Sequence, residues 1–109
     1  MPRLALAGPL VVGDLTIDVG AYTVVVDGRS LLLPPREFRV LYVLAQNAGH
    51  VVSTEQLIAQ VWGAEYGGEP QIVYVHIRTL REKLEQEAAR PQRIVTVRGV
   101  GYKLVPQEG

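Results

Sequence analysis

The chain has 109 residues and no cysteine, and its 11 Lys and Arg residues balance its 11 Asp and Glu residues. This length predicts one domain, residues 1–109, with a single core, and the lack of cysteine excludes disulfides, thiolate metal sites and cysteine nucleophiles. Because no apolar run approaches the roughly 20 residues that span a bilayer, and the apolar stretch at the start is too short for a signal peptide, we expect a cytoplasmic protein without membrane contact.

The charges are unevenly distributed along the chain. Residues 1–69 hold four basic and seven acidic side chains, whereas residues 70–109 hold seven basic and four acidic ones. The resulting charges of −3 and +3 place the positive potential in the second part, which suits an anionic partner such as nucleic acid. A neutral total still predicts modest non-specific affinity, so specific contacts or dimerisation must supply much of the binding.

Short β-branched runs fill residues 10–33. They are separated by turns, and Asp27-Gly28 between two apolar runs is the strongest local signal of a two-residue hairpin. The last run extends from Ser30 to Leu33. We predict a small antiparallel sheet that covers one side of a helical core and carries no chemistry.

A first helix is predicted over residues 35–48. Pro34 and Pro35 end the sheet, and proline is tolerated in the first turn of a helix. Gly49 is expected to end this helix.

A second helix is predicted over residues 54–62. Ser53 and Gln56 have the form of a capping box at its start. The free backbone N–H groups there favour a DNA phosphate. Trp62, near its end, is either a plain core aromatic or also a donor to a phosphate through its indole N–H.

The third predicted helix, residues 71–87, has two different faces. Its apolar stripe consists of Val73, Ile77, Leu80 and Leu84, which share one narrow sector at 100° per residue. On the opposite sector, Val75 suits a thymine methyl group, and Arg78 suits guanine or a phosphate. The alternative is a solvated face on which Arg78 and Glu82 pair with each other. We take residues 71–86 as a candidate recognition helix.

The final segment, residues 94–105, predicts a tight hairpin. A β-branched run, Ile94 to Val97, is followed by a glycine-containing turn and a second strand from Tyr102. A helix followed at once by a basic hairpin is a winged-helix arrangement. We expect Arg98 at the tip to enter an A·T-rich minor groove, with the glycines keeping the turn narrow. The alternative is that Arg98 is only a solvent-exposed residue of the turn.

Several blocks of this sequence occur in the order and spacing of one family. The blocks are Pro35-Arg36-Glu37-Phe38, Gly49-His50-Val51-Val52-Ser53, Glu55-Gln56-Leu57, Val61-Trp62-Gly63, Val75-His76-Ile77-Arg78 with Leu80-Arg81 and Lys83-Leu84, and Thr96-Val97-Arg98-Gly99-Val100-Gly101-Tyr102-Lys103. Over residues 12–105 the chain resembles the effector domain of OmpR/PhoB-type response regulators. The resemblance implies an α+β fold, a winged helix-turn-helix with an N-terminal antiparallel sheet, three helices and a C-terminal β-hairpin wing.

The same resemblance implies a function and a set of site residues. The function is sequence-specific binding of double-stranded DNA as the output domain of a two-component transcriptional regulator, with a receiver domain upstream in the parent protein. The expected base contacts are Gln71, Val75, Arg78, Thr79 and Arg98. The expected phosphate contacts are Ser53, Thr54, Trp62, Arg81 and Tyr102. Glu65, Tyr66 and Glu69 lie in the loop that corresponds to the one that touches RNA polymerase.

The sequence departs from the family pattern at four positions. Threonine is usual where Pro34 stands, so the first helix has lost a side-chain cap. A basic residue is common near Gln71, an acid near Tyr74 and an arginine near Thr79. The target DNA sequence therefore does not carry over from the family.

Other functions are considered beside DNA binding. No pattern gives His50 or His76 a nucleophile or a metal partner, so we predict no enzyme activity, no metal and no cofactor. A winged helix used only for protein contacts is one alternative, and a one-component, membrane-tethered or antibiotic-pathway regulator is another. No face shows the heptad or apolar patch of an obligate dimer, so we expect a monomer alone and two copies on tandem DNA half-sites.

Overall fold

The computed structural model describes residues 8–108, and the expectation about the start of the chain lies outside them. The helices are α2 (Pro35–Gln46), α3 (Thr54–Leu57), which the π-helical segment η1 (Ile58–Trp62) continues, and α4 (Gln71–Leu84). The strands are β1 (Leu10–Val12), β2 (Leu15–Asp18), β3 (Thr23–Val26), β4 (Arg29–Leu31), β5 (Val51–Ser53), β6 (Ile94–Val97) and β7 (Gly101–Leu104). This element order confirms the predicted α+β winged helix-turn-helix. No helix within residues 8–108 has the length and apolar character needed to cross a bilayer.

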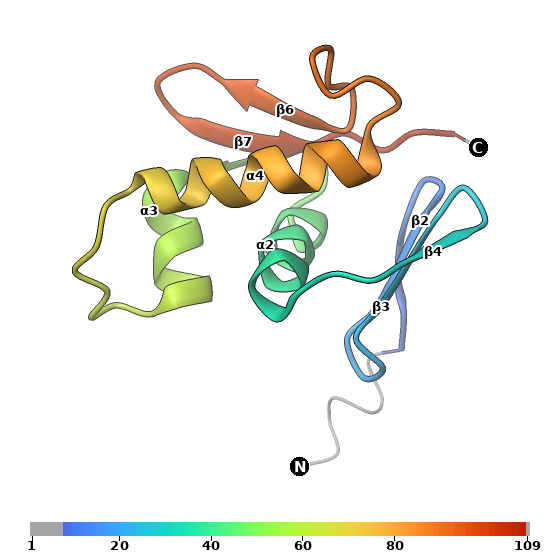
Figure 1. The fold of residues 1–109 in the computed structure, drawn as a ribbon, viewed down its shortest axis with the longest axis horizontal. Helices are drawn as coiled ribbons and strands as arrows, with labels where there is room; N and C mark the ends of the chain where they lie inside the picture. Colours follow the sequence, from blue (N-terminus) through green and yellow to red (C-terminus); the bar gives the residue numbers. More distant parts are fainter. Residues whose placement is uncertain (1–7, 109) are drawn as a thin grey trace.

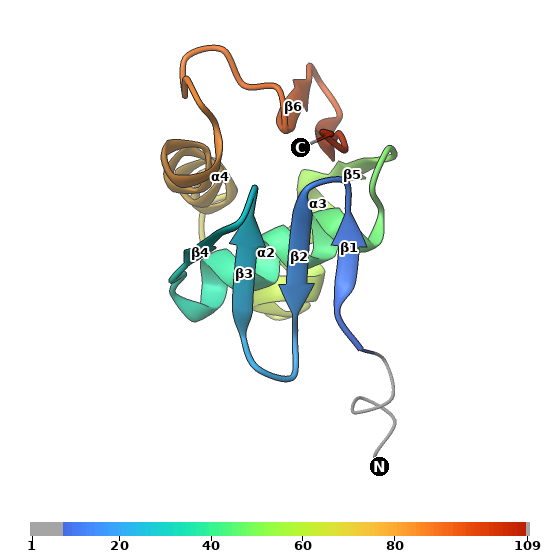
Figure 2. The same cartoon turned by 90° about the vertical axis from the view of Figure 1, so that its right-hand side faces the viewer.

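Strands β1 to β4 form the predicted N-terminal sheet, antiparallel throughout and in sequence order. Figure 2 shows this sheet in front of α2. Asp27 and Gly28 both have positive φ, 49° and 79°, as the two-residue turn requires. Strand β4 ends at Leu31, and the predicted continuation to Leu33 is wrong. The chain leaves the sheet there because Leu33 turns into the core while Leu32 stays exposed.

The core lies between this sheet, α2 and α4. The predicted apolar stripe of α4 is confirmed, since Val73, Ile77, Leu80 and Leu84 are all buried. Helix α2 ends at Gln46, two residues before the predicted end, because the side-chain amide of Asn47 donates to the Val43 carbonyl and the chain turns at Gly49 (φ 84°). No side chain caps the start of α2 at Pro34.

The second sheet has three strands in the order β5-β7-β6. The predicted C-terminal hairpin is present as β6 and β7, which we call the wing together with their turn (residues 94–104). Strand β5 was not predicted. It pairs with β7 through Val52 opposite Tyr102 and is continuous with the start of α3 at Ser53. Helix α2 contacts both α4 and β7, and in Figure 1 α4 runs alongside the wing.

Helix α4 ends at Leu84, so the predicted extension to residue 86 or 87 is wrong. Glu85 has an extended backbone (φ −83°, ψ 148°). Its carboxylate accepts hydrogen bonds from the backbone N–H groups of Gln92, Arg93 and Ile94, at 2.8 to 3.1 Å. These hydrogen bonds satisfy three backbone donors that lead into β6, and they compensate for the loss of a further helical turn at the end of α4.

One ion pair joins the two sheets. The guanidinium of Arg93, just before β6, donates to both carboxylate oxygens of Asp14, in the turn after β1, at 2.5 and 2.8 Å. Both side chains are largely buried, with 14% and 7% of their surface exposed. The hydrogen bonds from Arg93 hold the pKa of Asp14 below its usual range.

This ion pair makes stability depend on pH. We expect Asp14→Asn to lower the free energy of unfolding by about 2 kcal/mol at pH 7, between the values for exposed and buried pairs. Because the pKa of Asp14 is lowered in the folded state, its contribution is present above the ordinary aspartate pKa of about 3.9 and is lost as the pH falls below it. Urea unfolding at several pH values measures this. Glu65→Gln, which removes one negative charge from an exposed loop residue, is the control, and an equal loss in both variants would contradict the prediction.

Candidate nucleic-acid interface

The outward face of α4 presents the side chains expected to read bases. Gln71, Val75 and Arg78 are all exposed, and Val75 keeps 48% of its surface accessible. The pair considered as the alternative is also present, since Arg78 Nε lies 3.7 Å from Glu82 Oε2. Both side chains are more than half exposed, at 66% and 56%, and an exposed pair of this kind contributes little. Arg78 is therefore available to an incoming ligand.

Two other side chains of α4 are tied to their own helix. The Thr79 hydroxyl donates to the carbonyls of His76 and Val75, at 3.0 and 3.3 Å. It can still offer a ligand its methyl group and an acceptor lone pair. The Nδ1 atom of His76 lies 2.9 Å from the carbonyl of Ile72. Since a carbonyl only accepts, Nδ1 carries the hydrogen, and Nε2 is the acceptor in the neutral ring.

The capping box at the start of α3 is confirmed. The Ser53 hydroxyl oxygen accepts from the Gln56 N–H at 3.1 Å, and the Ser53 N–H donates to Gln56 Oε1 at 2.9 Å. The predicted helix 54–62 is an α-helix only to Leu57. Its second half is π-helical because the N–H of Gly63 donates to the carbonyl of Ile58, five residues back, at 2.9 Å. Such π-turns often occur at functional sites.

Trp62 ends this π-turn and packs against three side chains. The guanidinium of Arg36 lies 5.5 Å from the centre of the Trp62 ring, and the ring of His76 meets it edge-on at 5.0 Å. The ring of Tyr66 lies at 6.1 Å. Trp62 is half-buried. It therefore joins η1 to α2 and α4 at the end of the molecule where α4 begins.

The wing turn places Arg98 at its tip. The N–H of Val100 donates to the carbonyl of Val97 at 2.9 Å, and Gly99 has a φ of 79°, as the third position of a type II turn requires. Arg98 is exposed. Gly101 has a different role from the one predicted. A Cβ there would lie 2.0 Å from the carbonyl oxygen of Val52, so this glycine permits the close approach of β5 and does not shape the turn.

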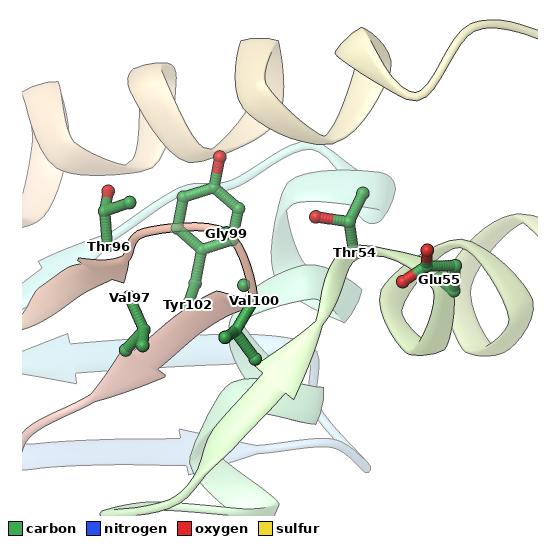
Figure 3. Close-up of a pocket in the computed structure, with 8 residues that line it drawn as sticks. Thr54, Glu55, Thr96, Val97, Gly99, Val100 and Tyr102 are labelled. Carbon is green, nitrogen blue, oxygen red and sulfur yellow. The ribbon is translucent and has the colours of Figure 1, made fainter.

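A hollow of about 260 Å³ separates the start of α3 from the wing. Figure 3 shows Thr54 and Glu55 on one side of it and Tyr102 on the other, with the Tyr102 hydroxyl pointing toward α4. Two of the expected phosphate contacts, Thr54 and Tyr102, thus lie at one site. Burial raises the pKa of Tyr102, so its hydroxyl is protonated at neutral pH and can donate. The exposed carboxylate of Glu55 is an unfavourable neighbour for a phosphate.

Arg81 faces the wing. Its Nε and Nη2 atoms donate to the carbonyl of Ile94 at 3.0 and 2.9 Å, and Nη2 also donates to the Thr96 hydroxyl at 2.8 Å. Its guanidinium lies 5.8 Å from the centre of the Tyr102 ring. Arg81 therefore donates several of its hydrogen bonds to the wing, and the expected phosphate contact of Arg81 stays a prediction.

The loop between η1 and α4 carries the acidic residues noted in the sequence. Glu65 and Glu69 are exposed, while Tyr66 is half-buried. The Tyr66 ring covers Gly68, where a Cβ would lie 2.2 Å from the hydroxyl oxygen. The two acidic side chains are thus exposed on a loop in which Tyr66 packs against Gly68. Across residues 8–108, no three His, Asp or Glu side chains gather where they could hold a metal ion.

Comparisons with known proteins agree with this geometry. Residues 28–104 match the family whose description is "Transcriptional regulatory protein, C terminal". The sensory transduction protein RegX3 of Mycolicibacterium smegmatis is 44% identical over 97 residues, which make up 89% of this chain and 42% of that protein. The chain thus spans less than half the length of this relative.

Two solved structures are similar over most of the chain. The response regulator DrrB, a Thermotoga maritima OmpR/PhoB homologue, has a TM-score of 0.82 and 36% identity, covering 95% of this chain and 48% of that one. The DNA-binding domain of Klebsiella pneumoniae RstA, solved in complex with the RstA box, has a TM-score of 0.81 and 35% identity, covering 91% of this chain and 98% of that one.

Proposed function

The chain belongs to the OmpR/PhoB-type family of C-terminal, DNA-binding domains of transcriptional regulators, which are not enzymes, and from this premise we propose how it reads DNA. Helix α4 enters the major groove of duplex DNA. Arg98 of the wing enters the adjacent minor groove. The domain acts as the output domain of a two-component regulator.

The observation that carries this proposal is the exposed strip of α4 beside the wing. Gln71, Val75 and Arg78 follow one another at helical spacing, and none is buried against the protein. An isolated exposed valine gains little from water, whereas a thymine methyl in the major groove gives it an apolar contact. An arginine one turn away adds a donor for guanine or a phosphate. Thr79, at the edge of the strip, completes the set of candidate base contacts.

The phosphate contacts of the proposal lie around this strip. Thr54 and Tyr102 lie on opposite sides of the hollow between α3 and the wing, Ser53 caps the start of α3, and Trp62 is the last residue of η1. Hydroxyl groups and backbone N–H groups of this kind position a protein on the DNA backbone without reading sequence. The domain of RstA, which this chain resembles over 91% of its length, was solved in complex with the RstA box. This likeness supports the same placement here.

The rest of the parent protein is also part of the proposal. Because RegX3 is longer than its match to this chain, we propose that a receiver domain in the parent controls the DNA-binding domain. The loop with Glu65, Tyr66 and Glu69 is the proposed contact to RNA polymerase, since exposed acidic groups there lie beside the start of α4. A winged helix used only for protein contacts would shift no duplex in an electrophoretic mobility assay.

Arg78 is the first residue to test. We expect Arg78→Ala to weaken binding to the specific duplex by roughly 1 to 3 kcal/mol, the range for one arginine that reads a base. Binding isotherms at several salt concentrations measure this. Glu82→Ala is the matched control, because it removes the partner of Arg78 and leaves the guanidinium in place. A uniform loss on all sequences, with the salt slope reduced by about one, would assign Arg78 to a phosphate.

The wing is tested with two duplexes that share one major-groove site. One has A·T-rich flanks and the other has G·C-rich flanks. We expect the wild type to prefer the A·T flank, because a narrow minor groove concentrates negative potential on an inserted arginine. Arg98→Ala should lose this preference, and Val100→Ala, an uncharged change in the same exposed turn, should keep it. Equal preferences in wild type and Arg98→Ala would remove the wing from the reading mechanism.

The stoichiometry follows from the size of one recognition helix. We expect the isolated domain to be a monomer, and two copies to occupy half-sites about one helical turn apart, about 10 base pairs. Sedimentation velocity with one-site and two-site duplexes measures this. A stable dimer at micromolar concentration without DNA would contradict the prediction.

A further inference from the structure

Arg81 and Glu85 join the C-terminal end of α4 to the outer strand of the wing. They lie four residues apart and contact the same residue, Ile94, along the outer edge of β6. Arg81 donates to the Ile94 carbonyl, and Glu85 accepts from the Ile94 N–H at 2.9 Å. Strand β6 has β7 on one side only. The end of α4 therefore takes the place that a further strand would take along β6.

The contacts of Arg81 also reach the base of the wing turn. Its Nη2 atom bonds the hydroxyl of Thr96, two residues before Arg98. Its guanidinium lies over the ring of Tyr102, directly opposite Thr96 in the neighbouring strand. One side chain of the recognition helix thus holds both strands of the wing. An arginine suits this role because its planar group donates in a fixed fork and stacks on a ring, which a lysine cannot reproduce.

We propose that Arg81 is a positioning residue that sets the distance and angle between α4 and the wing. The distance between α4, in the major groove, and Arg98, in the neighbouring minor groove, is then fixed. This inference rests on the proposed function. It predicts that the protein recognises the separation between its major-groove site and the A·T-rich flank, in addition to recognising each of them.

A set of duplexes tests the spacing. One carries the A·T flank in register with the major-groove site, and another carries it displaced by one base pair. We expect the wild type to prefer the first by about tenfold, the effect of one misplaced contact. Arg81→Lys should bind both alike while its salt dependence stays unchanged. Arg90→Gln, which removes an exposed arginine of the α4–β6 loop, is the control and should keep the wild-type preference.

Two results would overturn the inference. The first is a wild type that binds both duplexes equally. The second is an Arg81→Lys variant that keeps the wild-type preference, together with an Arg81→Gln variant that binds every duplex more weakly and has a salt slope lower by about one. That combination would assign Arg81 to a phosphate.

A measurement without DNA separates this inference from the proposed function. Residual dipolar couplings of the backbone N–H groups report the orientation of α4 relative to β6 and β7. We expect one orientation in the wild type, and altered or averaged couplings of the wing in Arg81→Lys and, more weakly, in Thr96→Val, with the couplings of α2 and α4 unchanged. Identical wing couplings in all three proteins would overturn the positioning role. A wild type that binds no duplex would overturn the proposed function. The couplings would still test the positioning role of Arg81.

Discussion

The carboxylate of Glu85 joins the end of α4 to the start of the wing, and the arrangement of the candidate DNA-binding face depends on it. It accepts from the backbone N–H groups of Gln92, Arg93 and Ile94, which lead into β6. Because Glu85 follows Leu84 directly, the last buried residue of the recognition helix and the first residues of the wing are fixed to each other. Arg81 and the ion pair between Arg93 and Asp14 extend the same connection to Tyr102 and to the N-terminal sheet.

The candidate DNA face is not strongly basic. Arg78 has Glu82 beside it, and Thr54 has Glu55 beside it. A face with such neighbours gains little from long-range attraction to phosphates, so the proposed binding depends on contacts that fit one sequence. The positions where this chain lacks the family's usual charges, Gln71 and Thr79, lie on the same strip. Neutral groups there favour hydrogen bonds and methyl contacts over charge, which makes recognition depend on geometry more than on electrostatic attraction.

Periodicity and motif spacing were sufficient for the larger elements. They predicted the apolar stripe of α4, the Asp27-Gly28 turn and the capping box at Ser53, because each depends on residues close in the sequence. Several features that they did not predict depend on distant partners. Strand β5 has three residues and exists because β7 pairs with it, Gly101 is required by the carbonyl of Val52, and Arg81 donates a hydrogen bond to Ile94 across 13 positions. No local pattern contains these partners.

The pairing of β5 with β7 links Val52 to Tyr102 across 50 positions of the chain. Closing so long a loop costs conformational entropy before any contact stabilises it, so this sheet is expected to form late in folding. Helix α4 lies within the loop that is closed. On a ribosome, α2, α3 and α4 are all synthesised before β7. A nascent chain therefore contains α4 before it contains both strands of the wing, and the sheet β5-β7-β6 can form only after residues 101–104 have been made.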